Sequence, residues 1–550
     1  MDPMNSTERI FFRLERDGYP IDVAGITIIE PSQQGPVPFE TVKRSMARVA
    51  TEVSYLRRRV SPAPLGIGED HWVMVDAVDI DAHVRQVTCP APGDERALLD
   101  LVLELTAAPL DRSRPLWEVW YVVGMAQGRS SLVLRGHHAL TDGVGFMKLY
   151  SAVFHADEDI APLEDSAPES AGDDLGYVEE HRAEREPGVI VRAAAEVPER
   201  LLVNTLTGVR IARTLVSGVP QVAAGLGRSL LGKAQALPAK TGEAADALRG
   251  EGTAAIPPLP RLPRLPRFIP SWTSHPPVTR FNRHVTDPTK SMAVASLPLA
   301  DIEAARGAHP GSTVNDVILA LTSGALRRYL EPLGEIPEQP LLTTCPVNVR
   351  STPGRESSGG ASSGGNAFTA IWVELPVQLD DPVERLAAVH AGSDRAKGHL
   401  RGSRASWGLL ADVGDLLLPG VVSAAMEFAG SRAFQAFPPT LNLSVSTLRG
   451  PEPLFFHGRK VEHLYARIII CPPVHLFIHA ITYDGLVEMG ILSVKQLLPD
   501  PDRMAGLLRT ELDALLARVQ PVHDAAPPTR PRAAAQRHGS PRPARTHRPG

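Results

Sequence analysis

The sequence predicts an α/β protein built from two globular halves. Its 550 residues exceed what one hydrophobic core usually holds, which favours two domains plus connecting segments. Hydrophobic residues make up 43% and charged residues 22% of the chain, as in ordinary globular proteins. Strand-like runs mixed with helical apolar spacing occur on both sides of a long middle region of different composition.

The first half is predicted to span residues 1–180. Tyr121–Val123 and Ser131–Leu134 are strand-like, because they are short and rich in apolar and β-branched residues. Glu95–Leu105 has apolar residues at helical spacing. Both kinds of element therefore belong to this half.

The middle region, residues 181–275, is predicted to connect the halves. Val189–Leu231 is rich in Ala, Leu, Val and Arg and is typical of amphipathic helices, with breaks at Pro198 and Pro220. Pro257–Arg267 has proline at nearly every third position, which favours a stiff polyproline segment.

The second half is predicted to span residues 276–522 and is followed by a basic tail, residues 523–550. Thr313–Leu330 is a helix candidate, and Ala466–Ile470 and Leu476–Tyr483 are strand candidates. The tail holds six arginines and no acidic residue from position 525 onward, so we expect it to be disordered. It is either a solubilising segment or a site of attraction to anionic lipid headgroups.

Charge, cysteines and hydropathy exclude several classes of protein. The formal charge of −5 gives no electrostatic case for nucleic-acid binding. Cys89, Cys345 and Cys471 lie far apart and form no metal or redox motif, which fits a reducing compartment. We expect no signal peptide, and the uncharged apolar stretches are too short to cross a membrane. The sequence thus predicts a cytosolic protein or one lying on a membrane surface.

The chemistry is predicted at His137-His138-Ala139-Leu140-Thr141-Asp142-Gly143, which lies between a strand-like run and a helix-like run, Val144–Phe154. Acyl transfer from a thioester to an alcohol needs a base for the hydroxyl proton, and neutral imidazole has a suitable pKa near 7. We expect Asp142 to hold the loop that aims the imidazole and Gly143 to permit a tight turn.

The histidine pair has two other interpretations. The pair could be packed side chains at a strand end without a chemical role. A metal site is disfavoured, because adjacent strand residues face opposite ways and no further ligand cluster is present.

A fainter version of the motif, His479-Ala480-Ile481-Thr482-Tyr483-Asp484-Gly485, occurs in the second half, either by chance or because the halves are similar domains.

Several blocks together resemble the bacterial wax ester synthase/acyl-CoA:diacylglycerol acyltransferase family, within the CoA-dependent acyltransferase superfamily with its HHxxxDG motif. The resemblance covers nearly the whole chain up to about residue 520. Its blocks are His137–Gly143, Pro109–Glu118, His83–Arg85, Thr313–Ala320, Pro346–Arg350 and Gly365-Asn366. The family's Asn-Val-Pro-Gly-Pro-like element is replaced by Ser444–Pro451, which bears on acceptor choice if that element shapes the acceptor channel.

The resemblance implies two chloramphenicol-acetyltransferase-like α/β domains with the active site between them, in a channel open at both ends. His138 would be the general base, with His137, Asp142 and Gly143 in the same motif. Asn315 and Asp316 would support the channel or the domain interface, although capping of a helix N-terminus also explains them. Trp117 is interpreted as a core aromatic residue.

The implied activity is transfer of a fatty acyl group from acyl-CoA to diacylglycerol, giving triacylglycerol, or to a long-chain alcohol, giving a wax ester. We expect no cofactor and no metal. We expect peripheral association with the inner membrane surface or lipid droplets, and no nucleic-acid partner. The alternatives are a condensation-like or glycolipid acyltransferase with a carrier-bound donor, and a catalytically idle lipid-surface binding protein.

Overall fold

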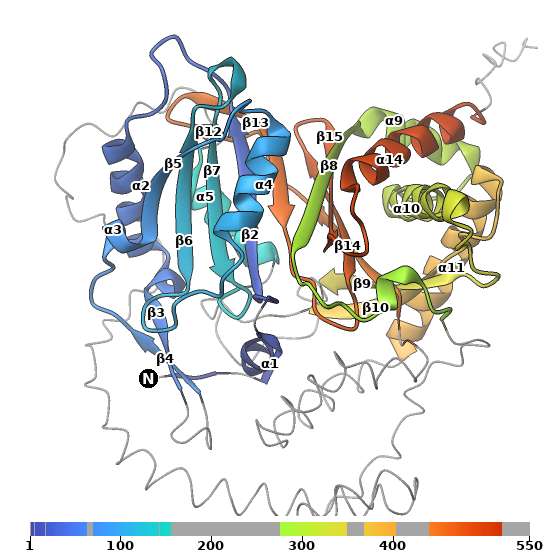
Figure 1. The fold of residues 1–550 in the computed structure, drawn as a ribbon, viewed down its shortest axis with the longest axis horizontal. Coiled ribbons are helices and arrows are strands. Elements are labelled where there is room, and N and C mark those ends of the chain that lie inside the picture. Colours follow the sequence, from blue (N-terminus) through green and yellow to red (C-terminus); the bar gives the residue numbers. More distant parts are fainter. Residues whose placement is uncertain are drawn as a thin grey trace, which may run out of the picture.

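The computed structural model describes residues 2–4, 6–16, 18–62, 70–141, 143–155, 276–348, 368–402, 439 and 441–519. The predicted connector helices, the polyproline segment and the basic tail lie outside these residues. Two six-stranded sheets lie side by side, with α2 and α3 on the outer side of one and α10, α11 and α14 on the outer side of the other (Figure 1). This confirms the predicted two-part α/β architecture.

The N-terminal sheet has the order β12-β13-β2-β7-β6-β5 and is antiparallel except for the β5–β6 pair. Its strands are β12 (Phe455–Phe456), β13 (Arg459–Arg467), β2 (Asp22–Ile29), β7 (Ser130–His137), β6 (Trp117–Val123) and β5 (Val84–Thr88). A separate small sheet comprises β1 (Asp2–Pro3), β4 (His71–Met74) and β3 (Arg58–Ser61).

Two strands of the N-terminal sheet come from the second half of the chain. β13 pairs antiparallel with β2, and Ala466 lies opposite Gly25. A fully buried ion pair stabilises the pairing of β13 with β2, because the Arg467 guanidinium donates hydrogen bonds to the carboxylate of Asp22. The two halves are therefore joined by shared backbone pairing as well as by side-chain packing.

The C-terminal sheet has the order β10-β9-β11-β14-β15-β8. β11 is parallel to both of its neighbours, and the other pairs are antiparallel. Its strands are β10 (Phe368–Leu375), β9 (Leu341–Asn348), β11 (Leu443–Arg449), β14 (Leu476–Tyr483), β15 (Leu486–Val494) and β8 (Lys290–Pro298).

The helices of the first half are α1 (Ser6–Leu14), α2 (Phe39–Glu52), α3 (Ile80–His83), α4 (Glu95–Leu105) and α5 (Gly143–Val153). Those of the second half are α9 (Leu299–Ala305), α10 (Val314–Leu330), α11 (Pro382–Gly402) and α14 (Pro501–Leu516). Short 3-10 turns are η1 (Ser54–Arg57), η3 (Ala126–Gly128), η4 (Arg280–Asn282), η5 (Arg306–Ala308) and η6 (Glu331–Leu333). Among the described residues, no helix is long and apolar enough to cross a membrane.

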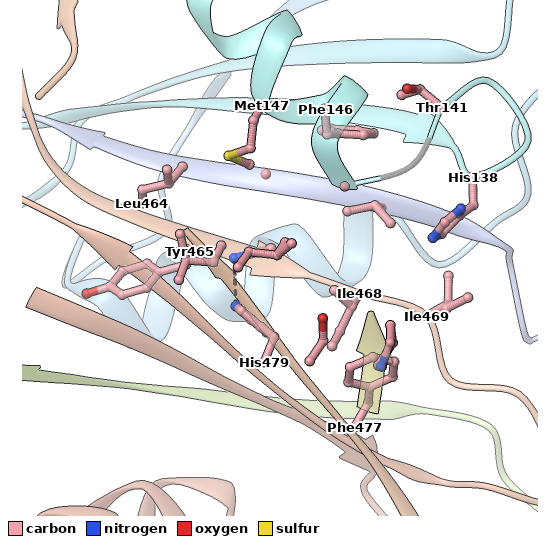
Figure 2. Close-up of a pocket in the computed structure, with 18 of the residues that line it drawn as sticks. His138, Thr141, Phe146, Met147, Leu464, Tyr465, Ile468, Ile469, Phe477 and His479 are labelled. Carbon is pink, nitrogen blue, oxygen red and sulfur yellow. Dashed lines mark hydrogen bonds between the residues drawn. The ribbon is translucent and has the colours of Figure 1, made fainter. Parts of the chain in front are cut away.

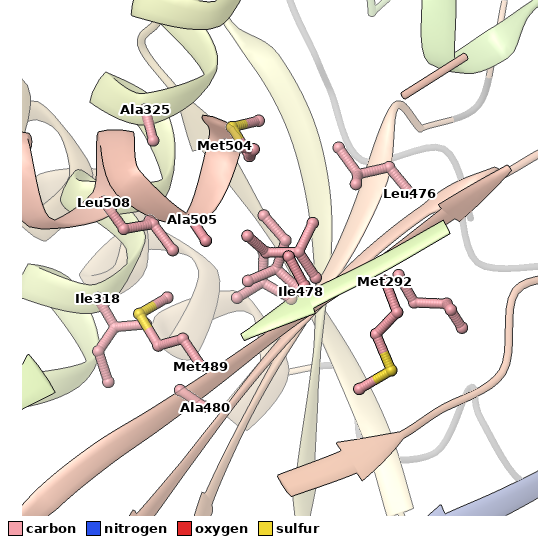
Figure 3. Packing of buried hydrophobic residues seen from close by; sticks show 14 of the residues in the cluster. Met292, Ile318, Ala325, Leu476, Ile478, Ala480, Met489, Met504, Ala505 and Leu508 are labelled. Atoms are coloured by element: carbon pink, nitrogen blue, oxygen red, sulfur yellow. The ribbon is translucent and has the colours of Figure 1, made fainter. Parts of the chain in front are cut away.

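The alternation of side chains along β14 connects the core to the site. Ile478 and Ala480 face the helices, where they pack with Ile318 of α10 and Leu508 of α14 (Figure 3). The intervening residues, including His479, face the opposite side and line a cavity. Apart from His479 and Thr482, β14 is apolar or aromatic on both faces because both faces are covered, one by helices and the other by the N-terminal half.

Most sequence-predicted elements are found. Glu95–Leu105 is α4 and Leu476–Tyr483 is β14, while Thr313–Leu330 is α10 preceded by its N-cap Thr313. The predicted strand Ala466–Ile470 is wrong beyond Arg467, where β13 ends. Its apolar residues are explained differently, because Ile468 and Ile469 line the cavity.

Candidate active site

The histidine motif lies where β7 leaves the N-terminal sheet. His137 is the last residue of the strand, and His138 opens the turn that follows. Backbone hydrogen bonds hold this turn: the His138 N–H donates to the Ile21 carbonyl at 2.9 Å, and the Leu140 N–H donates to the His137 carbonyl at 3.0 Å. The imidazoles of His137 and His138 lie in different surroundings.

His137 is buried among supporting side chains, with only 1% of its surface exposed. Its Nδ1 accepts from the Ala139 N–H at 3.1 Å, so in the neutral ring the proton is on Nε2. Nε2 lies 3.3 Å from Glu15 Oε2, and the ring stacks on Phe12 with centroids 4.3 Å apart. His137 is therefore fixed in one orientation and directed away from the cavity.

Glu15 is the acidic partner of His137. Its carboxylate also accepts a hydrogen bond from Arg112 Nη2 at 2.8 Å. Burial by itself raises the pKa of the Glu15 carboxyl, but hydrogen bonding and charge from His137 and Arg112 outweigh it and lower the pKa from 4.5 to about 2. No local sequence pattern indicated this residue, which lies more than a hundred positions before the motif.

Glu15→Gln tests this charge while keeping the shape of the side chain. Because the folded-state pKa is lowered, ionised Glu15 stabilises the fold above pH 4.5, and this contribution is lost as pH falls toward 2. We expect the variant to be less stable at pH 7 by roughly 3 kcal/mol, with the difference shrinking below pH 4.5. Urea unfolding across this range measures it. A difference that does not change with pH would show that Glu15 acts by shape alone.

His138 is half-buried and faces a cavity of about 280 Å³ (Figure 2). Its ring stacks on Phe11, with centroids 4.4 Å apart. Consecutive phenylalanines of α1 thus pack on consecutive histidines of the motif. His137 is therefore buried behind the cavity wall, whereas His138 is part of that wall.

The cavity lies between the two halves and is lined mainly by apolar side chains. The first half contributes residues from α1, β2, the motif and α5, and the second contributes residues from β9, β11, β13, β14 and the segment after β13. Ser446, Thr447 and Leu448 of β11 are part of the wall. Ser444–Pro451, the segment that replaces the family's Asn-Val-Pro-Gly-Pro-like element, therefore contributes side chains to the cavity wall.

Asp142 of the motif lies outside the described residues. Gly143 is the first residue of α5, and an added Cβ would meet Leu448 Cδ1 of the second half at 3.2 Å. Gly143 does not have a positive φ, so the close approach to Leu448 across the interface is what favours glycine here, and the tight turn expected from the sequence stays a prediction.

Asn315 and Asp316 lie in the first turn of α10 and make different contacts. Asp316 is buried and forms a capping box with Thr313, and it also accepts from His390 Nδ1 at 3.0 Å. Asn315 Oδ1 accepts from Thr447 Oγ1 at 2.9 Å. Asn315 thus contacts the cavity wall through Thr447, whereas Asp316 caps the helix.

Trp117 packs in the core of the first half, as expected. It is 2% exposed, its indole N–H donates to the Leu56 carbonyl at 2.8 Å, and the His83 ring stacks on it with centroids 4.3 Å apart. The Pro109–Glu118 and His83–Arg85 blocks therefore contact each other away from the cavity. Within the described part of the chain, no three His, Cys, Asp or Glu side chains are grouped so as to hold a metal ion.

Family models match both halves. Residues 4–318 match the wax ester synthase/diacylglycerol acyltransferase catalytic domain, and residues 364–516 match the corresponding C-terminal domain. A probable diacylglycerol O-acyltransferase of Mycobacterium tuberculosis is 29% identical over 94% of this chain and 99% of its own. A second M. tuberculosis protein with the same provisional enzyme name is 31% identical over 81% of this chain and 83% of its own.

Solved structures agree on the fold. The wax ester synthase/diacylglycerol acyltransferase from Marinobacter aquaeolei VT8 superposes with a TM-score of 0.61 at 22% identity, covering 94% of this chain and 100% of that one. A condensation domain of the calcium-dependent antibiotic synthetase reaches a TM-score of 0.50 at 13% identity, covering 94% of this chain and 96% of that one. At these identities the likeness concerns architecture only.

Proposed function

The chain belongs to the wax ester synthase/diacylglycerol acyltransferase family and is an O-acyltransferase, and we propose that His138 is the general base of a transfer from fatty acyl-CoA to diacylglycerol, a long-chain alcohol or both. The observation that carries this proposal is the position of His138. It is the histidine of the motif that faces an apolar cavity between the halves, while His137 is buried behind it.

The proposed reaction needs no covalent acyl-enzyme. His138 accepts the hydroxyl proton as the alcohol oxygen attacks the thioester carbonyl, forming the new C–O bond. The tetrahedral intermediate then expels the CoA thiolate as the C–S bond breaks, and the imidazolium returns the proton to sulfur. Apolar walls suit fatty chains and exclude water, whose attack would hydrolyse the thioester.

The remaining motif residues support the base in this proposal. His137 is a positioning residue, fixed by Glu15 and Phe12. Asp142 would hold the loop after the base, and Gly143 would keep α5 close to β11. Asn315 would support the channel wall by holding Thr447, and Asp316 would fix the start of α10 that carries Asn315.

A turnover assay tests the function. CoA release would be followed with palmitoyl-CoA and either diacylglycerol or hexadecanol, and the lipid products identified. Formation of triacylglycerol or wax ester is expected. Hydrolysis of palmitoyl-CoA without ester formation would contradict the proposal.

We also propose that the protein binds the cytoplasmic face of the inner membrane or lipid droplets. The substrates are insoluble in water, so the cavity must reach a lipid surface. The arginines of the predicted amphipathic helices, Arg192, Arg200, Arg210, Arg213 and Arg228, suit anionic headgroups, as does the basic tail. The helices have a second possible role as a cover for the seam between the halves.

Vesicle flotation distinguishes these roles. The intact protein should float with anionic vesicles and less so at high salt, because exposed charges are screened within about 10 Å at moderate ionic strength. Neutralising the five arginines should reduce flotation, and a variant lacking residues 525–550 reports on the tail. Equal flotation of all three proteins would contradict docking by either segment. If only the tail deletion fails to float, the tail binds the membrane and the helices serve to link the two halves.

A further inference from the structure

A buried carboxyl group lies between the two large sheets and takes no part in the mechanism proposed above. It belongs to Glu488, near the start of β15, whose side chain is fully buried. The carboxyl group accepts a hydrogen bond from Ser296 Oγ of β8 at 2.5 Å and lies 2.8 Å from His463 Nδ1 of β13. A charge in such a position is costly unless it is paired, so the partners of Glu488 decide how it is tolerated.

Among the described residues, His463 is the one ionisable side chain that pairs with Glu488. Arg129 pairs with two other carboxylates, Glu95 of α4 and Glu462 of β13, at 3.9 Å from each. Burial by itself lowers the pKa of His463, but hydrogen bonding and charge from Glu488, together with charge from Glu95 and Glu462, outweigh it and raise the pKa above 6.5. His463 therefore supplies the positive charge that Glu488 needs.

A β-bulge directs His463 toward this carboxyl group. The register between β13 and β2 shifts between Val461 and His463, which leaves Glu462 as the extra residue. Val461 and Leu464 consequently both pack in the core of the N-terminal half, while His463 and Tyr465 contact residues of the C-terminal sheet. The contact thus joins the two sheets, whose strands β13 and β15 lie next to each other (Figure 1).

Tyr465 connects this contact to the cavity. The His463 ring stacks on the Tyr465 ring, with centroids 5.6 Å apart and an interplanar angle of 10°. The Tyr465 hydroxyl lies 3.2 Å from Ser296 Oγ and donates to Glu95 Oε2 at 3.4 Å. Tyr465 is also part of the cavity wall, well apart from His138 (Figure 2). A change in the charge of His463 is therefore transmitted to a side chain that a substrate chain would contact.

We propose that His463 of β13 and Glu488 of β15 form a proton-dependent ion pair that holds the two sheets together and keeps Tyr465 in place in the cavity wall. When the pair loses its proton, the buried carboxylate is left without a positive charge. The His463 side chain is 23% exposed, so this proton can exchange with solvent. The ion pair goes beyond the proposed function, and only its effect on substrate binding rests on that function.

A double-mutant cycle on the full chain tests the ion pair. His463→Gln, Glu488→Gln and the double variant would be unfolded in urea at about pH 6 and about pH 9. Because the pKa of His463 is raised in the folded protein, the stabilisation is complete below pH 6.5 and is lost as pH rises through the folded-state pKa. At pH 6 we expect the two side chains to be coupled by a severalfold factor in the unfolding equilibrium constant, and at pH 9 by a smaller one.

Equal coupling at both pH values would show a hydrogen bond without a charge effect, and it would overturn the proposal, as would the absence of coupling. His309→Gln is the control, because it removes a half-buried histidine that bonds Ser312 and does not line the cavity. Its stability should vary with pH as that of the unaltered protein does. If Glu488→Gln does not fold, His463→Gln decides: it should lose less stability between pH 6 and pH 9 than the unaltered protein, and an equal loss would overturn the proposal.

The KM for hexadecanol, which has no titrating group in this range, measures the effect on the cavity. Between pH 6 and pH 9 we expect this KM to rise severalfold more in the unaltered protein than in His463→Gln, while kcat follows the titration of His138 in both. The same change of KM in both proteins would overturn the link through Tyr465. Absence of ester formation at every pH would instead contradict the proposed function and leave the urea experiment to decide on the ion pair.

Discussion

His138→Ala should lower acyl transfer by about 10²–10⁴-fold while leaving the fold intact. The imidazole is half-buried at the cavity wall, and of the two histidines of the motif it is the one that lines the cavity, so its removal takes away the proposed base. Initial rates with palmitoyl-CoA and diacylglycerol would be compared between the variant and the unaltered protein. Circular dichroism and melting temperature would establish that both are folded.

His137→Ala is the matched control, because the same side chain is removed one position earlier. We expect its main effect on stability, since His137 contacts Glu15 and Phe12 and does not line the cavity. The loss of activity per folded molecule should be smaller than for His138→Ala. Equal losses would contradict the separate roles, and near-normal rates for His138→Ala would exclude it as the base.

Local sequence signals were sufficient for the histidine pair and for several elements around it. The motif was placed at a strand end because a short strand-like run, Ser131–Arg135, precedes it, and β7 does end at His137. Thr313–Leu330 was likewise predicted to be a helix with Asn315 and Asp316 near its start, and Asp316 does cap α10 together with Thr313. These features depend on residues within a few positions of one another.

Features that depend on distant residues were not predicted. β13 joins a sheet whose neighbouring strand lies more than 400 residues earlier, and no local periodicity encodes that pairing. Ile468 and Ile469 were assigned to a strand because apolar runs look alike whether they pair in a sheet or line a cavity. Glu15 gave no signal because a single glutamate near the N-terminus is indistinguishable from a solvated one.

Asp22→Asn should be the most destabilising single change in the interface between the halves, costing about 3–5 kcal/mol of unfolding free energy. Asp22 is fully buried and accepts hydrogen bonds from two arginines, Arg135 of β7 and Arg467 of β13. Arg135 also pairs with Glu118 at 3.2 Å. Removing the Asp22 charge therefore leaves one arginine of this cluster without a carboxylate.

The double variant Asp22→Asn/Arg467→Met separates charge balance from general damage. It leaves Arg135 with Glu118, and the methionine fills much of the buried space with an apolar side chain. We expect its unfolding free energy in urea to be higher than that of Asp22→Asn alone, because the uncompensated buried cation is gone. Asp81→Asn removes an exposed carboxylate that pairs with Lys43, and it should leave the free energy of unfolding close to that of the unaltered protein. The free energy lost in Arg467→Met alone would be measured for comparison. If the double variant is less stable than Asp22→Asn by that same amount, the two side chains contribute independently. The ion pair between them would then not be what couples β13 to the N-terminal sheet.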